Sequence, residues 1–371
     1  LFALDPRVAP TRAAEAAGVA RAEALVARHA QDHGEPPRRI AMDLWGGPTL
    51  RTGGEAVAQA LALMGVRPTR DAATARVSGF EVLAVAALGR PRVDVLLRVS
   101  GLFRDMFPGL IGLIDSAARA VAARAEEGDD NPLAREGADA PRLFGPAPGA
   151  YGAGLARALD RDDWRDVADL GADYLALTDH AYAGAGEARR DGSFAARAAA
   201  ADAHALATDA PSLDALTGDA GAHHAGGFAA ASRAAGGAPT LYHLDASAPG
   251  AARARPLAEE IARIARARLV NPVWIAGLKR HGHRGAGEIA EALDNLAAYA
   301  GLAQVAPSRL FDLCFDAYCA DADTRRFLRE ANPAAARAIA GRFRSLAARG
   351  LWISRRNSVE PLLDDLAGRA P

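Results

Sequence analysis

Short apolar runs alternate with stretches of helical spacing over the first third of the chain. Residues 39–45 form a largely apolar run that leads into a Gly-Gly-Pro sequence at 46–48, which is typical of a strand that ends in a turn. After the Gly-Gly pair at 53–54, apolar residues recur at i, i+4 and i+7 over 57–64, which predicts a helix. The order of these features predicts the first strand and helix of an α/β fold.

The same alternation continues as far as residue 126. Residues 76–85 and 93–100 are two further strand candidates, and apolar residues recur at helical spacing over 110–121. Strands separated by helices predict a parallel sheet, because parallel strands need a crossover connection. Residues 126–140 are acidic and interrupted by Gly and Pro, so we expect a solvated loop or a subdomain boundary there.

Helical spacing predominates in the rest of the chain. The expected fold class is therefore α/β, with a parallel sheet in the N-terminal part and a mainly helical C-terminal part. Helices are predicted over 163–182, from Pro256 onward, over 285–300 and over 307–320, and one short strand over 240–244.

Composition places the chain among ordinary globular proteins. Hydrophobic residues make up 50% of the 371 and charged residues 24%, which excludes a largely disordered chain. The length suggests two or three domains of ~150 residues each. We expect an α/β part at 1–126, a mixed and helix-rich part at 127–254, and a helical part at 255–371.

Charge and cysteine content exclude several classes of protein. The balance of 44 Lys+Arg against 45 Asp+Glu argues against a protein that coats nucleic acid. Two cysteines exclude a disulfide scaffold and suit a reducing compartment. No apolar run approaches the ~18 residues of a membrane helix, and no signal peptide is visible, so we expect a cytoplasmic location. The opening at Leu1 suggests a cut through a longer protein.

The most polar strand-end turn lies at residues 98–109. Arg98 ends the predicted strand, Ser100 lies in the turn, and Arg104 and Asp105 precede the helix. In open α/β sheets ligands bind beyond the carboxyl ends of the strands, where helix N-termini favour anions. Two arginines at such a turn suit a ligand rich in carboxylates. An Arg104–Asp105 pair that merely orders the loop accounts for the same residues equally well.

The turn at residues 46–55 has the same architecture. Arg51 lies in the Gly-rich turn, and Glu55 lies in the first turn of the predicted helix. A glutamate at that position complements the helix dipole, which is a sufficient structural reason for it. The functional alternative is a carboxylate that faces the same strand-end cleft as the 98–109 turn.

The histidines give weaker signals. His281 and His283 could chelate a metal from an extended backbone, since residues i and i+2 share a face. The surrounding Lys and Arg disfavour a dication, so a solvated basic turn is the preferred interpretation. His223 and His224 are expected to be exposed loop residues.

Neither the cysteines nor the glycines indicate a cofactor site. Cys314 and Cys319 point about 140° apart on a helix, so they are expected to be buried apolar residues and not metal ligands. The glycine cluster at 149–154 is interpreted as a turn, and no P-loop sequence occurs in the chain.

These segments resemble, in the same order, the CobN-type large subunit of cobaltochelatase and its relative, the large porphyrin-binding subunit of magnesium chelatase. The matching stretches cover most of residues 5–358. The Arg-Thr-Gly-Gly sequence at 51–54 and the run at 98–109 are similar to the cobalt branch of the family. The other matching stretches include "DPRVAPTRAA", "RVSGFEV", "RLFGPAPGAYGAGL", "YHLDASAP", "RLVNPVWIAGLKRHGHRGAGEIA", "ANPAAARAIAGRF" and "GLWISRRNS".

The resemblance implies part of the corrin-binding subunit of an ATP-dependent cobaltochelatase. Such an enzyme inserts Co(II), its substrate metal, into hydrogenobyrinate a,c-diamide in aerobic cobalamin biosynthesis. ATP is then hydrolysed by separate AAA+ motor subunits of the CobS and CobT type, and not by this chain. The alternatives are a magnesium chelatase large subunit that acts on protoporphyrin IX, and a non-catalytic tetrapyrrole-binding paralogue.

Metal insertion requires a dehydrated metal ion and a base for the ring protons, and a corrin of this kind carries peripheral carboxylates. From these requirements we assign expected roles to the residues described above. The predicted catalytic residues are Glu55, Asp105 and His281, the predicted substrate-binding residues are Arg51, Arg98, Ser100 and Arg104, and the candidate metal ligands are Glu55, His281 and His283.

One region departs from the family pattern. Family members carry a polar stretch with Asn, Asp, Glu and His before a Gly-Gly pair. Residues 204–228 keep Asp209, Asp214 and Asp219 but have Ala, Gly or Leu at many other positions. His283 also stands where a tyrosine is common. If the lost side chains held cobalt or moved protons, this homologue would bind a tetrapyrrole without metallating it.

Overall fold

The computed structural model describes residues 4–155, 159, 166–184, 186–210, 212–245 and 252–369. Contacts group the chain into two compact units. Unit 1 comprises Leu1–Arg157, Arg165–Ser212 and Gly227–Pro256, and unit 2 comprises Ala158–Trp164, Leu213–Gly226 and Leu257–Pro371. The three parts expected from the sequence, with boundaries after residues 126 and 254, stay a prediction. No helix within the described ranges is both long and apolar enough to cross a membrane.

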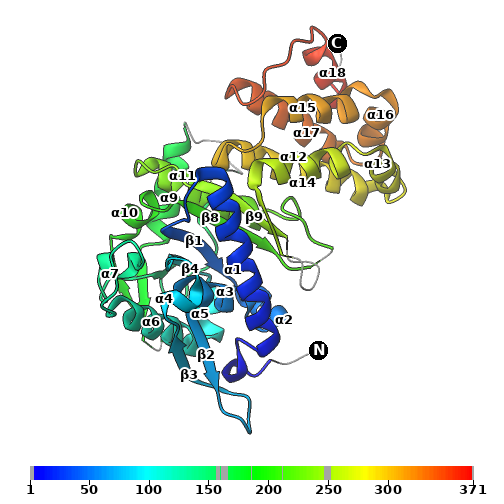
Figure 1. The fold of residues 1–371 in the computed structure, drawn as a ribbon. Helices are drawn as coiled ribbons and strands as arrows, with labels where there is room; N and C mark the ends of the chain where they lie inside the picture. The colour runs from blue at the N-terminus through cyan, green and yellow to red at the C-terminus, as the bar shows by residue number, and fades with distance from the viewer. Residues whose placement is uncertain are drawn as a thin grey trace. The chain divides into compact units, whose positions relative to one another are not determined.

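Unit 1 is built on a sheet that has eight strands within the described residues, in the order β10-β9-β8-β1-β4-β5-β6-β7. Figure 1 labels β9, β8, β1 and β4 of this sheet. Strands β9, β8, β1, β4 and β5 run parallel, and antiparallel strands complete both edges. The predicted α/β class with a parallel sheet is therefore confirmed. The strands are β1 (Arg39–Leu44), β4 (Asp94–Val99), β5 (Leu143–Gly145), β6 (His180–Ala183), β7 (Glu187–Arg190), β8 (Ala203–Thr208), β9 (Thr240–Asp245) and β10 (Arg253–Pro256).

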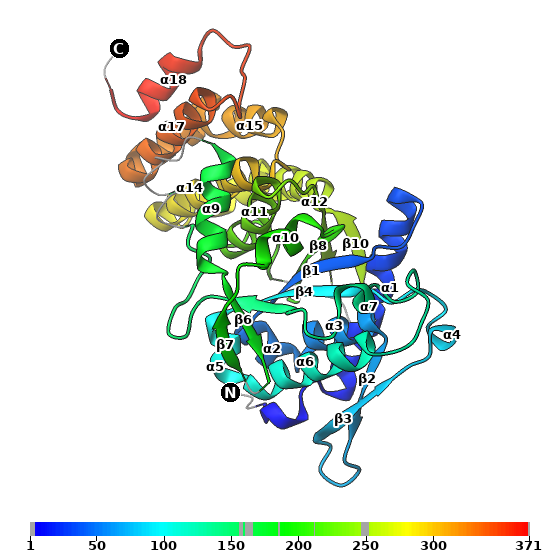
Figure 2. The same cartoon turned by 90° about the vertical axis from the view of Figure 1, so that its left-hand side faces the viewer.

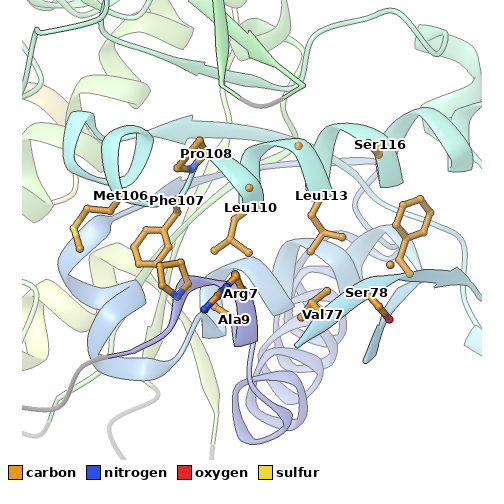
Figure 3. A pocket seen from close by; sticks show the side chains of 15 residues that line it. Arg7, Ala9, Val77, Ser78, Met106, Phe107, Pro108, Leu110, Leu113 and Ser116 are labelled. Atoms are coloured by element: carbon orange, nitrogen blue, oxygen red, sulfur yellow. The ribbon is translucent and has the colours of Figure 1, made fainter. Parts of the chain in front are cut away.

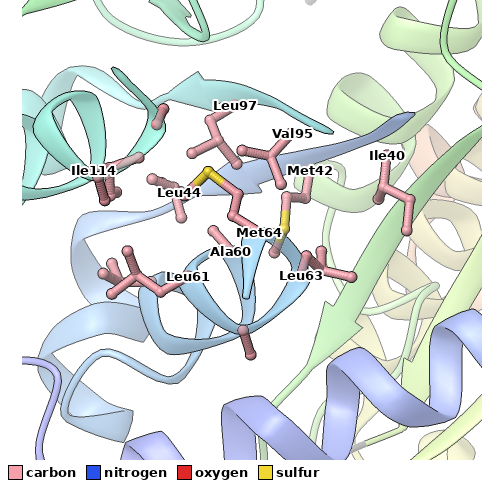
Figure 4. Close-up of a cluster of buried hydrophobic side chains, with 14 of the residues drawn as sticks. Ile40, Met42, Leu44, Ala60, Leu61, Leu63, Met64, Val95, Leu97 and Ile114 are labelled. Carbon is pink, nitrogen blue, oxygen red and sulfur yellow. The ribbon is translucent and has the colours of Figure 1, made fainter. Parts of the chain in front are cut away.

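One face of this sheet is apolar, because alternate side chains of each strand share a face. Ile40, Met42 and Leu44 of β1 lie in a buried cluster with side chains of three helices. Figure 4 shows these three residues beside side chains of two of the helices. Burial of one such side chain contributes ~1.5–3 kcal/mol. The helices on this face are α1 (Arg12–His33), α3 (Glu55–Met64) and α6 (Pro108–Ala122).

The opposite face carries charged residues. Asp43 of β1 is the register partner of Arg98 of β4, and both side chains are buried. Nearer the start of the strands, the fully buried Asp94 accepts hydrogen bonds from Arg142 at 2.6 Å and Arg197 at 3.0 Å. Figure 2 shows helices on both sides of the strands. The helices on the charged face are α9 (Val167–Leu177), α10 (Phe194–Ala199) and α11 (Gly227–Ala234).

Unit 2 is helical within the described residues, as expected for the C-terminal part. Phe315, Phe343 and Trp352 pack together in its core, with ring centroids 4.8–5.4 Å apart. Its helices are α12 (Leu257–Ile264), α13 (Pro272–Lys279), α14 (Gly282–Ala298), α15 (Ser308–Phe315), α16 (Ala322–Ala331), α17 (Pro333–Ala348) and α18 (Val359–Leu366), with π-helical turns at Ala222–Gly226, Ala265–Leu269, Tyr299–Ala303 and Asp316–Ala320.

Several local predictions were wrong. The expected turn at 46–48 begins a short helix, α2 (Gly46–Thr52), and the expected loop at 126–140 contains α7 (Pro132–Glu136). The strand candidate at 76–85 is confirmed as β3 (Val77–Val82), but this strand does not belong to the main sheet. It pairs in antiparallel fashion with an unexpected β2 (Val66–Arg70). Short neighbouring elements joined by tight turns give little periodicity, so pattern alone merges or misses them.

The predicted helix over 163–182 was also too long. In its described part the helix α9 ends at Leu177, and β6 begins at His180. The remaining short elements are the 3-10 turn Pro6–Val8, α4 (Val85–Leu88) and α5 (Gly101–Met106).

Candidate functional site

The carboxyl ends of β1, β4 and β8 meet at one edge of the sheet, because β1 pairs in parallel with both other strands. Each strand leads directly into a polar segment at this edge. α2 follows β1, α5 follows β4, and Asp209 follows β8. The edge brings Arg51, Glu55 and Asp209 together, and these residues form the candidate site.

A Gly-Gly pair gives Glu55 its position. Gly53 and Gly54 have φ values of 70° and 97°, in the left-handed region that other residues disfavour. Gly54 also lies so close to Pro10 that a Cβ would be 3.1 Å from the Cα atom of Pro10. The tight turn ends α2 and begins α3 at Glu55.

Glu55 accepts a hydrogen bond from the guanidinium of Arg21, which comes from the middle of α1. The Arg21 side chain is 3% exposed and that of Glu55 is 21% exposed. Burial raises the pKa of Glu55. The positive charge of Arg21 opposes that rise, and the negative charge of Asp209 adds to it. A carboxyl group with a raised pKa and partial access to solvent is suited to proton exchange.

Arg51 and Asp209 form the second ion pair of the site. Nη2 of Arg51 donates to Oδ1 of Asp209 at 2.7 Å and to Oδ2 at 2.9 Å, and Nε donates to Oδ2 at 3.2 Å. This side-on pairing fixes the plane of the guanidinium. Asp209 was not among the predicted site residues, although it is one of three aspartates kept in the diverged region.

The predicted substrate-binding residue Arg98 is buried in this structure. Its Nε donates to Oγ1 of Thr178 at 3.2 Å, and its Nη2 donates to the carbonyl oxygen of Gly152 at 2.7 Å. The guanidinium carbon also lies 5.0 Å from the centre of the Tyr174 ring. Arg98 therefore ties the loop after β5 to α9. A direct contact between Arg98 and a ligand carboxylate stays a prediction.

The other residues of the 98–109 turn are also engaged locally. Oγ of Ser100 accepts the backbone N–H of Phe103 at 3.1 Å and so caps α5. Nε of Arg104 donates to Asp105 at 2.7 Å, and its Nη1 donates to the carbonyl oxygen of Ala147 at 2.8 Å. The hydroxyl of Tyr151 donates to Asp105 at 2.7 Å. The Arg104–Asp105 pair that the loop-ordering alternative requires is therefore present. The ligand roles of Ser100, Arg104 and Asp105 stay predictions.

An aspartate–histidine pair lies buried beneath the edge. Nε2 of His204 on β8 lies 3.2 Å from Oδ2 of Asp43 on β1. The ring of His204 packs against Phe228 with centroids 4.8 Å apart. The signal in the sequence is the single aspartate, Asp43, near the end of the otherwise largely apolar run at 39–45.

The histidine predictions concern unit 2. His281 and His283 are exposed at the start of α14, in agreement with a basic turn. His224 is buried in a π-helical turn, so the prediction that it is an exposed loop residue was wrong. Within the described part of the chain, no group of three His, Cys, Asp or Glu side chains is arranged to hold a metal ion. The metal-ligand roles of Glu55, His281 and His283 stay predictions.

The prediction that the two cysteines are buried is confirmed. Cys314 and Cys319 are both free and buried, and burial raises the pKa of the Cys314 thiol to about 12. A thiol that keeps its proton is a poor metal ligand.

An apolar hollow of about 570 Å³ lies elsewhere in unit 1, between the N-terminal turn, β3 and α6 (Figure 3). Phe107, Leu110 and Leu113 line it, and Arg7 at its border pairs with Asp5. None of the predicted site residues lies among its lining residues, so we place the candidate site at the strand edge.

Comparisons with known proteins agree with the family resemblance that the sequence motifs indicated. A family model described as CobN/Magnesium Chelatase matches residues 1–359. An aerobic cobaltochelatase subunit CobN from Sinorhizobium sp is 41% identical over 380 residues, which cover 96% of this chain and 30% of the relative. The chloroplastic magnesium-chelatase subunit ChlH of Oryza sativa subsp. japonica is 29% identical over 383 residues, which cover 98% of this chain and 27% of the relative.

A solved structure extends the similarity to the whole described fold. The catalytic subunit of cobaltochelatase from Mycobacterium tuberculosis aligns with a TM-score of 0.95 at 37% identity. The alignment covers 99% of this chain and 32% of that one. The chain thus spans about a third of the length of the proteins it matches.

Proposed function

Because the chain belongs to the CobN/magnesium chelatase family, we propose that it is part of the corrin-binding subunit of an ATP-dependent cobaltochelatase. The reaction inserts Co(II), as a substrate, into hydrogenobyrinate a,c-diamide during aerobic cobalamin biosynthesis. The higher identity to the cobalt relative, 41% against 29% for the magnesium relative, supports cobalt over magnesium.

The single observation that carries a chemical role for this chain is the Arg21–Glu55 pair. As Co(II) enters the ring, ring N–H protons must leave, and a carboxylate with a raised pKa can accept one and pass it to water. Glu55 has that raised pKa and keeps partial contact with solvent. In this proposal Arg21 holds Glu55 in place, and Glu55 is the proton acceptor.

Arg51 supplies the other half of the site. It lies at the same sheet edge, is half-exposed, and offers a guanidinium to a peripheral carboxylate of the corrin. The N-cap and first turns of α5 also border this edge, with Ser100, Arg104 and Asp105. We propose that these three residues belong to the corrin site. Arg98 anchors the loop beside them, and His281 remains a second candidate base in unit 2.

The motor is a further part of the proposal. The chain has no P-loop sequence, so ATP would be hydrolysed by AAA+ partner subunits of the CobS and CobT type. The proposal places this assembly in the cytoplasm.

One assay separates the proposed function from its alternatives. The full-length subunit is combined with its motor subunits, ATP, Co(II) and hydrogenobyrinate a,c-diamide, and metallation is followed by absorbance. Cobalt insertion that depends on ATP supports the proposal. Insertion of Mg²⁺ into protoporphyrin IX instead would assign the magnesium branch, and corrin binding without insertion would indicate a non-catalytic paralogue.

A further inference from the structure

The Arg51–Asp209 pair uses only one edge of the arginine. Nε and Nη2 of Arg51 both donate to Asp209, over 2.7–3.2 Å. In the part of the chain that the structure describes, no hydrogen bond uses Nη1 of Arg51. A guanidinium has five N–H groups in a rigid fork, so an arginine bound along one edge can still bind a second carboxylate along the other.

The exposed part of the pair belongs to the arginine. The Arg51 side chain is 47% exposed, whereas that of Asp209 is 9% exposed. Asp209 is the first residue after β8, which lies between β9 and β1 in the sheet, so its backbone position is set by the end of that strand. The buried carboxylate of Asp209 thus holds one edge of the half-exposed guanidinium of Arg51.

We propose that Asp209 is a positioning residue of the corrin site, which holds the guanidinium of Arg51 so that its free edge receives a peripheral carboxylate of the substrate. This inference rests on the proposed function and deepens it. Pre-orientation matters because a free arginine loses rotamer freedom on binding, and a guanidinium that is already fixed loses less.

The same contact has an opposite interpretation, in which Asp209 blocks Arg51 until substrate displaces it. The surroundings of Asp209 argue against displacement. Its charge acts on both Glu55 and Arg21. If Arg51 left, Arg21 would have to balance two carboxylates, one of them largely buried. An unpaired buried charge is costly, so the pair should persist when substrate binds.

The two interpretations predict affinity changes of opposite sign, which a binding experiment can measure. The full-length subunit is titrated with hydrogenobyrinate a,c-diamide by absorbance, for wild type, Arg51→Ala, Asp209→Asn, Asp209→Ala and the double variant Arg51→Ala/Asp209→Ala. A corrin whose peripheral carboxylates are all amides is the control ligand. Asp316→Asn, in the exposed Arg356–Asp316 pair of unit 2, is the control variant.

If Asp209 positions Arg51, Arg51→Ala weakens binding about tenfold, as expected for loss of one charge-assisted hydrogen bond. Asp209→Ala then weakens binding about threefold to tenfold, Asp209→Asn weakens it less, and the double variant is no weaker than Arg51→Ala. The amide ligand and Asp316→Asn show no such differences. Circular dichroism and thermal melting of each variant establish that it is folded.

Tighter binding by Asp209→Ala would identify a blocking residue and overturn the proposal. Unchanged binding by Asp209→Ala, with Arg51→Ala still weakened, would also overturn it and leave the proposed function intact. A folded wild-type protein that binds no corrin would instead refute the proposed function together with this inference.

Discussion

Arg21 and Glu55, which are 34 residues apart in the sequence, form an ion pair in which the arginine is buried and the carboxylate is partly open to solvent. The pair joins the middle of α1 to the first residue of α3. Because α3 begins at the carboxyl edge of the sheet, one contact both anchors a helix on the core and fixes an ionisable group at the candidate site.

Replacement of Arg21 should therefore affect stability and titration together. Arg21→Met keeps much of the side-chain volume but leaves Glu55 without its counter-charge. We expect unfolding free energy to fall by about 2 kcal/mol at neutral pH, less than for a fully buried pair because Glu55 contacts solvent. Urea unfolding measures this loss. In the double variant Arg21→Met/Glu55→Gln the loss should be smaller than the sum of the single losses; simple additivity would contradict the pairing.

The raised pKa of Glu55 predicts a pH dependence of opposite sign to that of most carboxylates. A carboxyl group whose pKa is higher in the folded than in the unfolded state binds more protons when folded, so it destabilises the fold as pH rises. Stability conferred by protonated Glu55 should be lost as pH rises from the ordinary value of 4.5 through the folded-state value. Unfolding of wild type and Glu55→Gln over this pH range measures the effect. The wild type should lose stability relative to the variant as pH rises, and a constant difference would show that the pKa is unperturbed.

Glu126 should show the pH dependence of stability that is usual for a carboxylate with a lowered pKa, and the effect should be large. It accepts two hydrogen bonds from the buried Arg92, at 2.7 and 2.8 Å, which lower the pKa of Glu126 to about 2. Its stabilising effect should be complete above pH 4.5 and should be lost as pH falls towards 2. Glu126→Gln should cost about 3 kcal/mol at pH 7 and very little near pH 2. Glu81→Gln, in the exposed Arg67–Glu81 pair, should change stability by less than about 1 kcal/mol. Equal effects of the two variants at pH 7 would be inconsistent with this account.

The sequence identified the position of Glu55 but not its partner. The Gly-Gly pair at 53–54 marks a left-handed turn before a helix, and the prediction that Glu55 lies in the first turn of that helix is confirmed. Arg21 lies in a helix rich in Ala and Arg, where Arg12 and Arg28 look equivalent to it in spacing and surroundings. Only the packing of α1 on α3 distinguishes the buried arginine from the others, and that packing is a tertiary property.

For Arg98 and Arg104, in the 98–109 turn, the sequence predicted the position but not the hydrogen-bond partners that decide their role. Their position after a parallel strand predicted a place near the site, and both are close to the sheet edge. Their hydrogen bonds, however, include bonds to the backbone carbonyls of Gly152 and Ala147, which lie 54 and 43 residues away in the sequence. A carbonyl carries no sequence signal, since every residue has one, so residue types alone could not separate a loop anchor from a ligand contact.

Gly54 offers a test of how closely the turn controls the site. Gly54→Ala combines a positive φ of 97° with a Cβ 3.1 Å from the backbone of Pro10. Gly34→Ala, at the end of α1, has a comparable φ of 84° but open space around the new Cβ. We expect Gly34→Ala to cost about 1–2 kcal/mol, the usual penalty of the left-handed conformation. Gly54→Ala should cost more and should also reduce metal insertion by the full-length complex. Equal costs, with insertion unaffected, would mean that the turn can shift without disturbing Glu55.

The most direct test of the account is metal insertion by Glu55→Gln, in the full-length subunit with its motor subunits. Glu360→Gln is the matched control, because Glu360 is also a first-turn glutamate, on α18, and it is exposed. If Glu55 accepts ring protons, Glu55→Gln should bind corrin normally and insert cobalt at least tenfold more slowly, while Glu360→Gln inserts it normally. The size of that loss follows from the ~10²–10⁴-fold contribution usual for acid–base groups. Normal insertion per folded Glu55→Gln molecule, with only a change in stability, would contradict the catalytic role and leave Glu55 as a structural partner of Arg21.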